Sequence, residues 1–177
     1  LTSYQALIDV AKLSTGESIL IHAGAGGVGT IGIQLAKHVG ANVTTTTSTK
    51  NIDLVKSLGA DNVIDYTKES YLDESSKFDV VFDTLGGKHT FDSFKVLKVG
   101  GRVVSIAGDL DSVTTKQLGL NKIISFLLAL KAKKITKVAS KMGALYRFLL
   151  MSPNGEQLKE LSKLYESGAI KPCLLYT

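Results

Sequence analysis

The glycine-rich segment Gly24–Gly29 restricts the possible folds of this chain more than any other part of the sequence. It reads Gly-Ala-Gly-Gly-Val-Gly and contains the complete pattern G-x-G-x-x-G. The apolar run Ile19–Ile21 precedes it, with the length and branching of a buried parallel strand. Apolar residues then recur at the spacing of one helix face, at Val28, Ile31, Leu35 and Val39. A strand, a glycine turn and a helix in this order are the context in which the pattern indicates a dinucleotide-binding loop.

Each glycine of the pattern has a separate physical reason. The first permits a tight turn, the second lets the backbone approach a pyrophosphate, and the third lets the helix pack closely on the strand. The N-terminus of the following helix offers free N–H groups and the positive end of a dipole. We therefore expect a pyrophosphate to be held by backbone N–H groups of Ala25, Gly26, Gly27, Val28 and Gly29. The alternative is a glycine turn that serves packing alone.

Length and composition are those of a soluble globular domain. The chain has 177 residues, of which 44% are hydrophobic and 21% charged, and we interpret residues 1–177 as one domain. The longest apolar run, Phe126–Leu130, is too short to span a bilayer, so we expect no membrane association. The single cysteine, Cys173, excludes an internal disulfide and a cysteine-rich zinc site within this chain, and favours a reducing, cytoplasmic setting.

The net charge of +5 raises the question of nucleic-acid binding. Much of the excess lies in one predicted helix, at Lys131, Lys133, Lys134, Lys137 and Lys141. A solvated helix face explains this group more simply than a nucleic-acid interface, and we predict no nucleic-acid partner.

Predicted strands and helices alternate along most of the chain. The expected strands are Ser18–Ala23, Asn42–Thr46, Asn62–Asp65, Phe78–Phe82, Arg102–Ile106 and Ala144–Leu150. The expected helices are Ser3–Leu13, Gly27–Val39, Lys50–Leu58, His89–Leu97, Leu118–Ser140 and Gln157–Ser167. We expect Thr67–Ser76 to form a short helix and a surface turn, Gly100-Gly101 to turn the chain into the fifth strand, and Lys171-Pro172 to begin an extended tail.

This alternation predicts an α/β fold, a doubly wound parallel sheet of six strands with helices on both faces. The expected strand order is that of the Rossmann fold, 3-2-1-4-5-6, with right-handed crossovers. A ligand is then expected at the carboxyl ends of the strands, near the switch point between the first and fourth.

Taken in order, several segments resemble the cofactor-binding domain of the medium-chain dehydrogenase/reductase superfamily, on the branch of quinone oxidoreductases and zinc-type alcohol dehydrogenase-like proteins. They are LTSYQAL, IHAGAGGVG, SLGADNVIDYTKE, FDVVFDTLGG, LKVGGRVVSIAG and SGAIKP. The resemblance implies an NADPH-binding domain of an oxidoreductase that transfers hydride to quinones or α,β-unsaturated carbonyls. It also implies a GroES-like substrate domain upstream of Leu1, without which we expect this domain to be inactive.

At the adenosine end, an NAD enzyme places an acidic residue about 20 positions after the glycine loop. Thr44–Ser48 contains no acid, and Lys50 follows. The hydroxyls of Thr47 and Ser48 together with Lys50 are suited to a 2′-phosphate, and the resemblance places Tyr66 near the same phosphate. The alternatives are a solvated lysine and a partly buried packing tyrosine, and related sequences often carry the lysine one residue later, where Asn51 stands here.

At the nicotinamide end, two loops follow the fourth and fifth strands. The resemblance places Asp83, Thr84 and Leu85, and Ile106, Ala107 and Gly108, beside the nicotinamide and its ribose. The alternative for Asp83 is to cap the next helix.

The three histidines carry no expected catalytic role. We interpret His22 as a packed structural residue and His38 and His89 as surface residues of helices. We therefore name no catalytic residue and no metal ligand, and the proton donor stays unassigned.

Three other functions stay open. They are the cofactor domain of a zinc-dependent alcohol dehydrogenase, a non-catalytic NADP-binding module, and a methyltransferase, which also places a glycine loop after its first strand. The last does not account for SLGADNVIDYTKE or for a sixth strand.

The predicted last strand, Ala144–Leu150, lies at an edge of the sheet and carries one charge, Arg147. The resemblance implies that this strand pairs with the same strand of a second subunit across a two-fold axis, so we predict a homodimer through Ala144–Leu150. The neighbouring apolar stretch Ile123–Leu130 is expected to widen this interface or to face the substrate domain. The alternative is a monomer whose edge is covered by its own helix.

Overall fold

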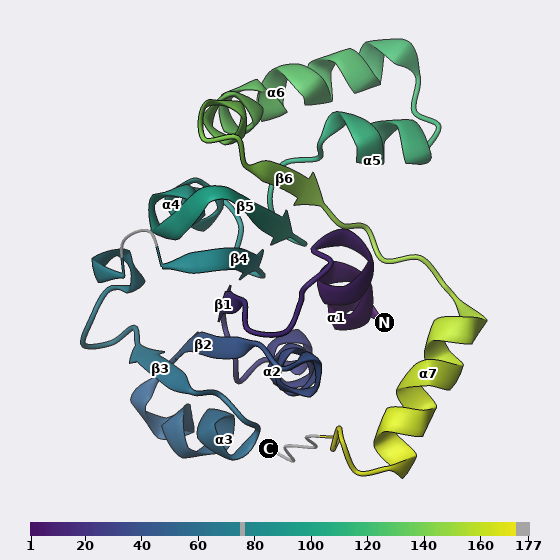
Figure 1. Ribbon diagram of the computed structural model, residues 1–177. Coiled ribbons are helices and arrows are strands. Elements are labelled where there is room, and N and C mark those ends of the chain that lie inside the picture. The colour runs from purple at the N-terminus through teal and green to yellow at the C-terminus, as the bar shows by residue number, and fades with distance from the viewer. Residues whose placement is uncertain (75–76, 173–177) are drawn as a thin grey trace.

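A computed structural model describes residues 1–74 and 77–172. Its centre is a sheet of six parallel strands in the order β3-β2-β1-β4-β5-β6, which confirms the predicted topology (Figure 1). The strands are β1 (Ser18–Ile21), β2 (Asn42–Thr47), β3 (Asn62–Asp65), β4 (Phe78–Asp83), β5 (Leu97–Ser105) and β6 (Leu145–Phe148).

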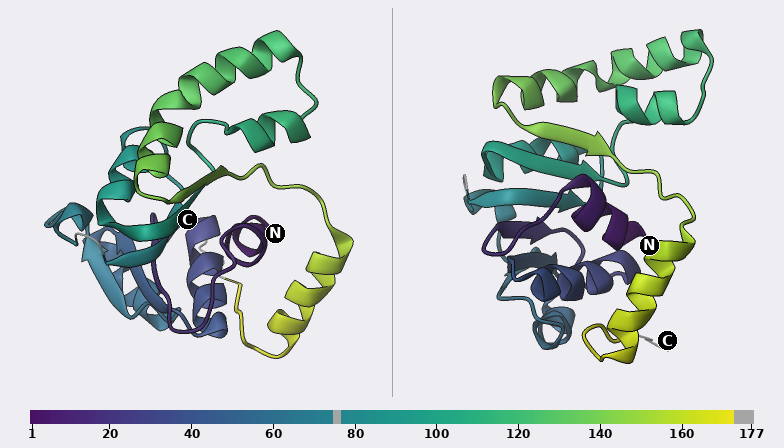
Figure 2. Two further views of the ribbon diagram at one scale, coloured as in Figure 1. Left: turned by 45° about the horizontal axis from the view of Figure 1, so that its top comes forward. Right: turned by 45° about the vertical axis from the view of Figure 1, so that its right-hand side comes forward.

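Helices cover both faces of this sheet, as expected for a doubly wound fold (Figure 2). One face carries α1 (Thr2–Tyr4), the π-helical turn η1 (Gln5–Val10), α2 (Gly27–Val39), α3 (Ile52–Ser57), which follows the 3₁₀ turn η2 (Thr49–Asn51), and α7 (Gly155–Glu166). The other face carries the 3₁₀ turn η3 (Tyr71–Asp73), α4 (Lys88–Val96) and α6 (Lys122–Lys141), and α5 (Ser112–Gln117) packs against α6.

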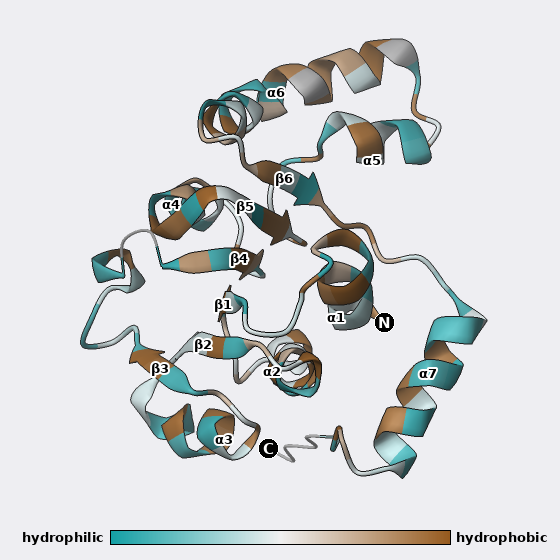
Figure 3. Cartoon of the chain, in the orientation of Figure 1, coloured by the Kyte–Doolittle hydropathy of each residue, from teal (hydrophilic) through white to brown (hydrophobic). Residues whose placement is uncertain are grey.

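The central strand β1 shows why the sheet has two cores. Ile19 and Ile21 point into the core beneath α2, and Leu20 points into the core beneath α4. All three are fully buried, because a strand in the middle of a parallel sheet has helices on both sides. Figure 3 shows hydrophobic colour in parts of β4 and β5, whereas β2, with its four threonines, is paler.

The predicted helix Leu118–Ser140 corresponds to α6, which begins at Lys122 rather than Leu118, and the short helix α5 that precedes it was not predicted. Asp111 caps α5 by accepting hydrogen bonds of 2.8 Å from the N–H groups of Val113 and Thr114. The turn after α5 contains Gly119 at φ +61°, a conformation that few other residues adopt, and Asn121 then caps α6. The two caps mark the starts of α5 and α6, and α5 lies before the predicted segment.

The predicted turn at Gly100-Gly101 is also wrong, because these glycines lie within β5, which begins at Leu97. The pairing of β4 with β5 shifts between Phe78 and Val80, as at a β-bulge. A Cβ on Gly101 would lie 2.7 Å from Leu97 Cγ, so the bend in the strand requires glycine there.

Other boundaries differ from the prediction by a few residues. β1 ends at Ile21 rather than Ala23, β6 is limited to Leu145–Phe148, and α7 begins at Gly155. Residues 75–76 of the predicted segment Thr67–Ser76, Cys173 and the rest of the tail after Pro172 lie outside the described residues.

The apolar first half of α6 projects beyond the sheet together with α5 (Figures 1 and 2). Ile123, Phe126 and Leu127 are each more than half exposed. Lys131, Lys133, Lys134, Lys137 and Lys141 of this helix are exposed as well, which confirms the predicted solvated face. Within the described residues, no helix combines the length and the apolar character that crossing a membrane requires.

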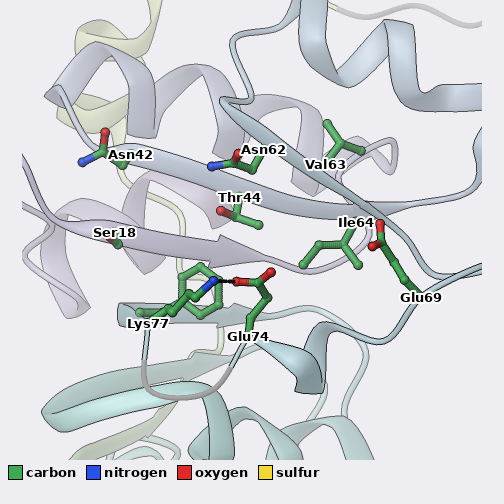
Figure 4. Close-up of a pocket in the computed structure, with 10 residues that line it drawn as sticks. Ser18, Asn42, Thr44, Asn62, Val63, Ile64, Glu69, Glu74 and Lys77 are labelled. Atoms are coloured by element: carbon green, nitrogen blue, oxygen red, sulfur yellow. Dashed lines mark ion pairs between the residues drawn. The ribbon is translucent and has the colours of Figure 1, made fainter.

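A groove of about 410 Å³ lies at the amino ends of β1 to β4 (Figure 4). Ser18, Thr44 and Asn62 form its floor, with Glu69 and the ion pair of Glu74 with Lys77 at its rim. The groove exists because the described part of the β3–β4 connection covers this sheet face only with the short turn η3. It lies at the end of the sheet opposite to the glycine loop.

Candidate functional site

The glycine loop connects β1 with α2 at the carboxyl edge of the sheet. The chain leaves β1 through His22 and Ala23, and Ala23 has φ +52°, which is uncommon for a residue with a side chain. A Cβ on Gly24 would lie 2.1 Å from Thr45 Oγ1, and one on Gly29 would lie 2.3 Å from the carbonyl oxygen of Ala23. The first and third glycines of the pattern are therefore required by packing between β1, β2 and α2.

The outer side of the loop is open. Gly26 and Gly27 are exposed, and a Cβ on Gly27 would meet no atom within 4 Å. Gly26 is the N-cap of α2, its carbonyl accepts the N–H of Thr30 at 2.9 Å, and no side chain caps the helix. The N–H groups of Gly27, Val28 and Gly29 therefore belong to the first turn, where no partner exists within the helix.

This geometry fits the pyrophosphate of a dinucleotide. Ala25 and Val28 flank the exposed glycines and are partly buried. The first turn of α2 contains no acidic residue, so nothing there opposes the positive end of the helix dipole. The loop thus has two sides, one fixed by packing and one free to receive an anion.

The predicted adenosine-end residues lie at the adjacent ends of β2 and β3. Thr47 is buried, and its carbonyl accepts the N–H of Tyr66 at 3.1 Å. Ser48 is partly buried and Lys50 is exposed. Tyr66 is 62% exposed, so its interpretation as a partly buried packing residue is wrong. The structure thus brings Thr47 and Tyr66 together and leaves the side chains of Lys50 and Tyr66 in solvent.

An acid that we did not include in the site, Asp65, occupies the end of β3. Its carboxylate is turned inwards and accepts hydrogen bonds from the hydroxyl of Thr49 and from the N–H and hydroxyl of Thr67, the last two at 3.0 and 2.7 Å. These hydrogen bonds, with Thr49 first, lower the pKa of Asp65 to about 2. Asp65 is the last residue of the predicted third strand, so the sequence places it at the carboxyl end of the sheet. Only the fold shows which hydroxyls surround its carboxylate.

The predicted nicotinamide-end loops meet at the carboxyl ends of β4 and β5. A Cβ on Gly86 would lie 2.1 Å from the carbonyl oxygen of Ala107, so the two loops are in contact. Ile106 donates its N–H to the carbonyl of Asp83 at 3.0 Å, and Gly108 donates its N–H to Ser105 Oγ at 2.8 Å. Leu85 is 45% exposed and Ala107 is exposed, so both side chains are accessible from solvent.

Asp83 itself is completely buried. Its carboxylate accepts the N–H groups of Leu85 and Gly86 at 3.0 and 2.9 Å, and the hydroxyls of Thr90 and Ser105 at 2.5 and 2.8 Å. The alternative of a helix cap is not observed, because the backbone N–H groups that Asp83 accepts belong to Leu85 and Gly86 in the turn before α4. From the first turn of the helix it accepts only the side-chain hydroxyl of Thr90. Asp83 therefore shapes the two loops from beneath.

The neighbouring Thr84 connects the fourth strand with the first. Its hydroxyl donates a hydrogen bond of 2.8 Å to the carbonyl of His22. The nicotinamide-end loops and the glycine loop are thereby joined at the switch point of the sheet.

His22 is buried, as expected for a structural histidine. Its ring contacts that of Tyr71 edge-on, with centroids 4.6 Å apart. Burial lowers the pKa of His22 to about 4, although the nearby carboxylate of Asp83 acts in the opposite direction. His38 is exposed as predicted, but the prediction for His89 is wrong, because it is half-buried and its Nδ1 lies 3.0 Å from the hydroxyl of Tyr71.

No three His, Cys, Asp or Glu side chains of the described residues lie together in a group suited to a metal ion.

Comparison with known proteins identifies the family. Residues 58–175 match the family model described as zinc-binding dehydrogenase. The chain is 41% identical over 175 residues to 2-methylene-furan-3-one reductase of Solanum lycopersicum. The aligned region covers 98% of this chain and 36% of that protein. The chain is also 40% identical over 163 residues to the chloroplastic NADPH-dependent alkenal/one oxidoreductase of Arabidopsis thaliana, covering 91% of this chain and 33% of that protein.

Comparison with solved structures finds the same class of oxidoreductase. The structure of the quinone oxidoreductase from Coxiella burnetii superposes with a TM-score of 0.75 at 34% identity, over 96% of this chain and 47% of that one. The chain thus spans about a third to a half of the length of these relatives. It belongs to the zinc-binding dehydrogenase family and is a cofactor-binding domain of the medium-chain dehydrogenase/reductase superfamily.

Proposed function

We propose that this chain is the NADPH-binding part of a reductase that delivers hydride to α,β-unsaturated carbonyls or quinones. The observation that carries the proposal is the glycine loop, whose inner side is fixed by packing and whose outer side presents the free first turn of α2. The names of the relatives, which include an NADPH-dependent alkenal/one oxidoreductase and a quinone oxidoreductase, support the substrate class.

In this proposal the chain's own residues bind and orient the cofactor, which supplies the hydride when bound. Backbone N–H groups of residues 25–29 hold the pyrophosphate. Lys50 and Tyr66, both exposed, face the 2′-phosphate together with the hydroxyl of Ser48. The side chain of Thr47 is buried, so Thr47 contributes to this site through its carbonyl, which accepts the N–H of Tyr66.

The two contacting loops at the ends of β4 and β5 form the nicotinamide end in this proposal. Leu85 and Ala107 offer accessible surface to the ring, and Thr84, Ile106 and Gly108 keep the backbone of both loops in place. Asp83 acts from beneath, since its carboxylate is occupied by four donors.

A titration of the protein with both cofactors tests the proposal. A charge-assisted contact to the 2′-phosphate contributes about 1.5–3 kcal/mol, so we expect NADPH to bind roughly tenfold to a hundredfold more tightly than NADH. Lys50→Ala should reduce this preference and leave the fold intact, and Lys56→Ala, an exposed lysine on α3, is the control. Equal affinities, or tighter binding of NADH, would contradict the proposal.

A second measurement separates an enzyme from a binding module. The full-length protein should oxidise NADPH in the presence of an α,β-unsaturated ketone or a quinone, and residues 1–177 alone should not exceed the rate of free NADPH. Absence of turnover with both substrate classes, despite tight NADPH binding, would favour the non-catalytic module. A zinc-dependent dehydrogenase would require ligands from outside the described residues.

Two further parts of the proposal concern assembly and location. We propose a homodimer through the edge strand β6, and we expect a cytoplasmic setting. The Arabidopsis thaliana relative is named as chloroplastic, so fractionation of cells that express the full-length protein is the measurement that decides the location.

A further inference from the structure

Lys50 and Tyr66 belong to two separate segments, and one carboxylate connects the residues beside them. Lys50 follows Thr49 in the short turn η2, and Tyr66 precedes Thr67 after β3. The Oδ2 atom of Asp65 accepts the hydroxyl of Thr49, and its Oδ1 atom accepts both the N–H and the hydroxyl of Thr67. The two threonine hydroxyls lie 3.3 Å apart, within hydrogen-bond distance of each other.

The backbone around Asp65 is fixed as firmly as its side chain. Its carbonyl accepts the N–H groups of Lys68 and Glu69 at 2.9 and 3.0 Å, and its own N–H donates to Glu69 Oε1 at 3.2 Å. Tyr66 donates its N–H to the carbonyl of Thr47 in the neighbouring strand. The ends of β2 and β3, which are neighbours in the sheet (Figure 1), therefore form one corner. The carboxylate of Asp65 is buried in it, and the side chains of Lys50 and Tyr66 are exposed outside it.

We infer that Asp65 is a positioning residue for NADPH: its carboxylate joins the segments of Lys50 and Tyr66 into one corner that receives the 2′-phosphate. This role rests on the proposed function, which places the phosphate at these two side chains. A charge-assisted bond to a hydroxyl is stronger than a neutral one, so a carboxylate holds such a corner better than an amide does.

The geometry separates this role from that of the ribose-binding acid of NAD enzymes. Such an acid follows the second strand and presents its oxygens to the ligand. Asp65 ends the third strand, only 4% of it is exposed, and each of its oxygens already accepts a hydroxyl from this chain. Hydrogen bonds to the charged form hold the pKa of Asp65 near 2, so it stays ionised near neutral pH while facing away from the phosphate.

Two possible roles of Asp65 predict opposite changes in NADPH affinity when this residue is substituted. If its negative charge only repelled the 2′-phosphate, Asp65→Asn and Asp65→Ala would both strengthen NADPH binding. If Asp65 positions the corner, both substitutions weaken NADPH binding. Asp65→Asn keeps part of the hydrogen bonding, so it should retain more of the NADPH preference than Asp65→Ala does. We expect the ratio of NADH to NADPH dissociation constants to fall about threefold in Asp65→Asn and about tenfold in Asp65→Ala.

Thr49→Val tests the same connection without a change in charge, and it serves if Asp65→Ala does not fold. It should lower the ratio about threefold in the wild type and less than about 1.5-fold in a Lys50→Ala background, because the bond acts through Lys50. Asp61→Asn is the matched control, since Asp61 precedes the other end of β3 and bonds Lys37 and the N–H of Val43. It should leave the ratio unchanged.

Calorimetric titrations with NADPH and NADH, on variants shown by circular dichroism to be folded, give these ratios. A wild type without any NADPH preference would overturn the proposed function and this role with it. A preference that persists in folded Asp65→Asn and Thr49→Val, or that rises in Asp65→Asn, would overturn only the role of Asp65. An equal loss in Asp61→Asn would also overturn it, because a general weakening of β3 would then explain the effect.

Discussion

The hydroxyl of Ser105 donates a hydrogen bond of 2.8 Å to the buried carboxylate of Asp83 and so joins the ends of β4 and β5. The same hydroxyl accepts the N–H of Gly108 at 2.8 Å. One buried side-chain pair therefore sets the shape of both loops that we assign to the nicotinamide end.

Asp83→Ala should be strongly destabilising. The substitution removes the acceptor of four hydrogen bonds, of which those from Gly86, Thr90 and Ser105 are buried and that from Leu85 is partly buried. We expect the free energy of unfolding to fall by about 3 kcal/mol or more, as measured by urea denaturation. Asp83→Asn keeps the acceptor for the two N–H groups and should cost less. Asp53→Ala on exposed α3 is the control and should change stability by less than about 0.5 kcal/mol.

Alanine at three glycines should separate folding from cofactor binding. Gly29→Ala places a methyl group 2.3 Å from the carbonyl oxygen of Ala23, so it should lower the free energy of unfolding by about 2 kcal/mol or more. Gly27→Ala meets no atom within 4 Å at the first position of α2, so stability should stay the same or rise by up to about 1 kcal/mol.

Gly26→Ala is the informative third variant. Its Cβ would approach the carbonyl oxygen of Ala23 at 3.2 Å, a smaller conflict than that of Gly29. The methyl group would stand on the exposed side where the pyrophosphate is proposed to approach, so NADPH affinity should fall about tenfold or more while the protein stays folded. Thermal melts and titrations of all three variants give the comparison. NADPH affinity unchanged in Gly26→Ala would place the pyrophosphate elsewhere.

These glycines also show how much of the molecule the sequence predicts. The strand, turn and helix around Gly24–Gly29 are encoded locally, and so is the strand order that follows from repeated βα units. The partners of Asp83 are not, because Ser105 lies 22 residues away in sequence and reaches Asp83 only when β5 pairs with β4. The same holds for Asp65, whose bond to Thr49 spans 16 residues.

The errors have a related origin. Apolar periodicity placed the start of a helix at Leu118 and missed α5, whereas the polar capping residues Asp111 and Asn121 mark where α5 and α6 begin. His89 has the spacing of a surface helix residue, and only the position of Tyr71, brought by the β3–β4 connection, buries one side of it. Capping signals were present in the sequence, but the contact of Tyr71 with His89 had no local signal.

Stability should fall as the pH is lowered from about 6.5 towards 4. The pKa of His22 is about 4 in the folded protein and 6.5 as the ordinary value, so in this range the unfolded chain binds a proton that the folded one does not. The full effect is about 3 kcal/mol, reached near pH 4. The carboxylates with lowered pKa, such as Asp65, lose their contribution mainly below about pH 5, so they add to the decrease only at the lower end of this range.

Urea denaturation at several pH values checks this dependence. In His22→Asn the decrease between pH 6.5 and 4.5 should be nearly lost, and in His38→Asn, a substitution of an exposed histidine, it should persist. An unchanged decrease in His22→Asn would show that another group titrates in this range.

The homodimer through β6 is the last prediction, and the structure changes how it must be tested. Phe148 donates its N–H to Asp111 Oδ2 at 3.0 Å, and its carbonyl accepts the hydroxyl of Thr114 at 2.7 Å, so α5 already occupies part of the outer edge. Phe148→Pro disrupts the outer edge of the strand and should convert a dimer to monomers, but it also loses the bond to Asp111. Asp111→Ala is therefore the matched control, since it loses that bond, and the cap of α5, while keeping the strand backbone intact. Light scattering should give a dimer for the wild type and for Asp111→Ala, and a monomer for Phe148→Pro. A monomeric wild type, or a dimer that persists in Phe148→Pro, would show that α5 covers the edge and that β6 is not the interface.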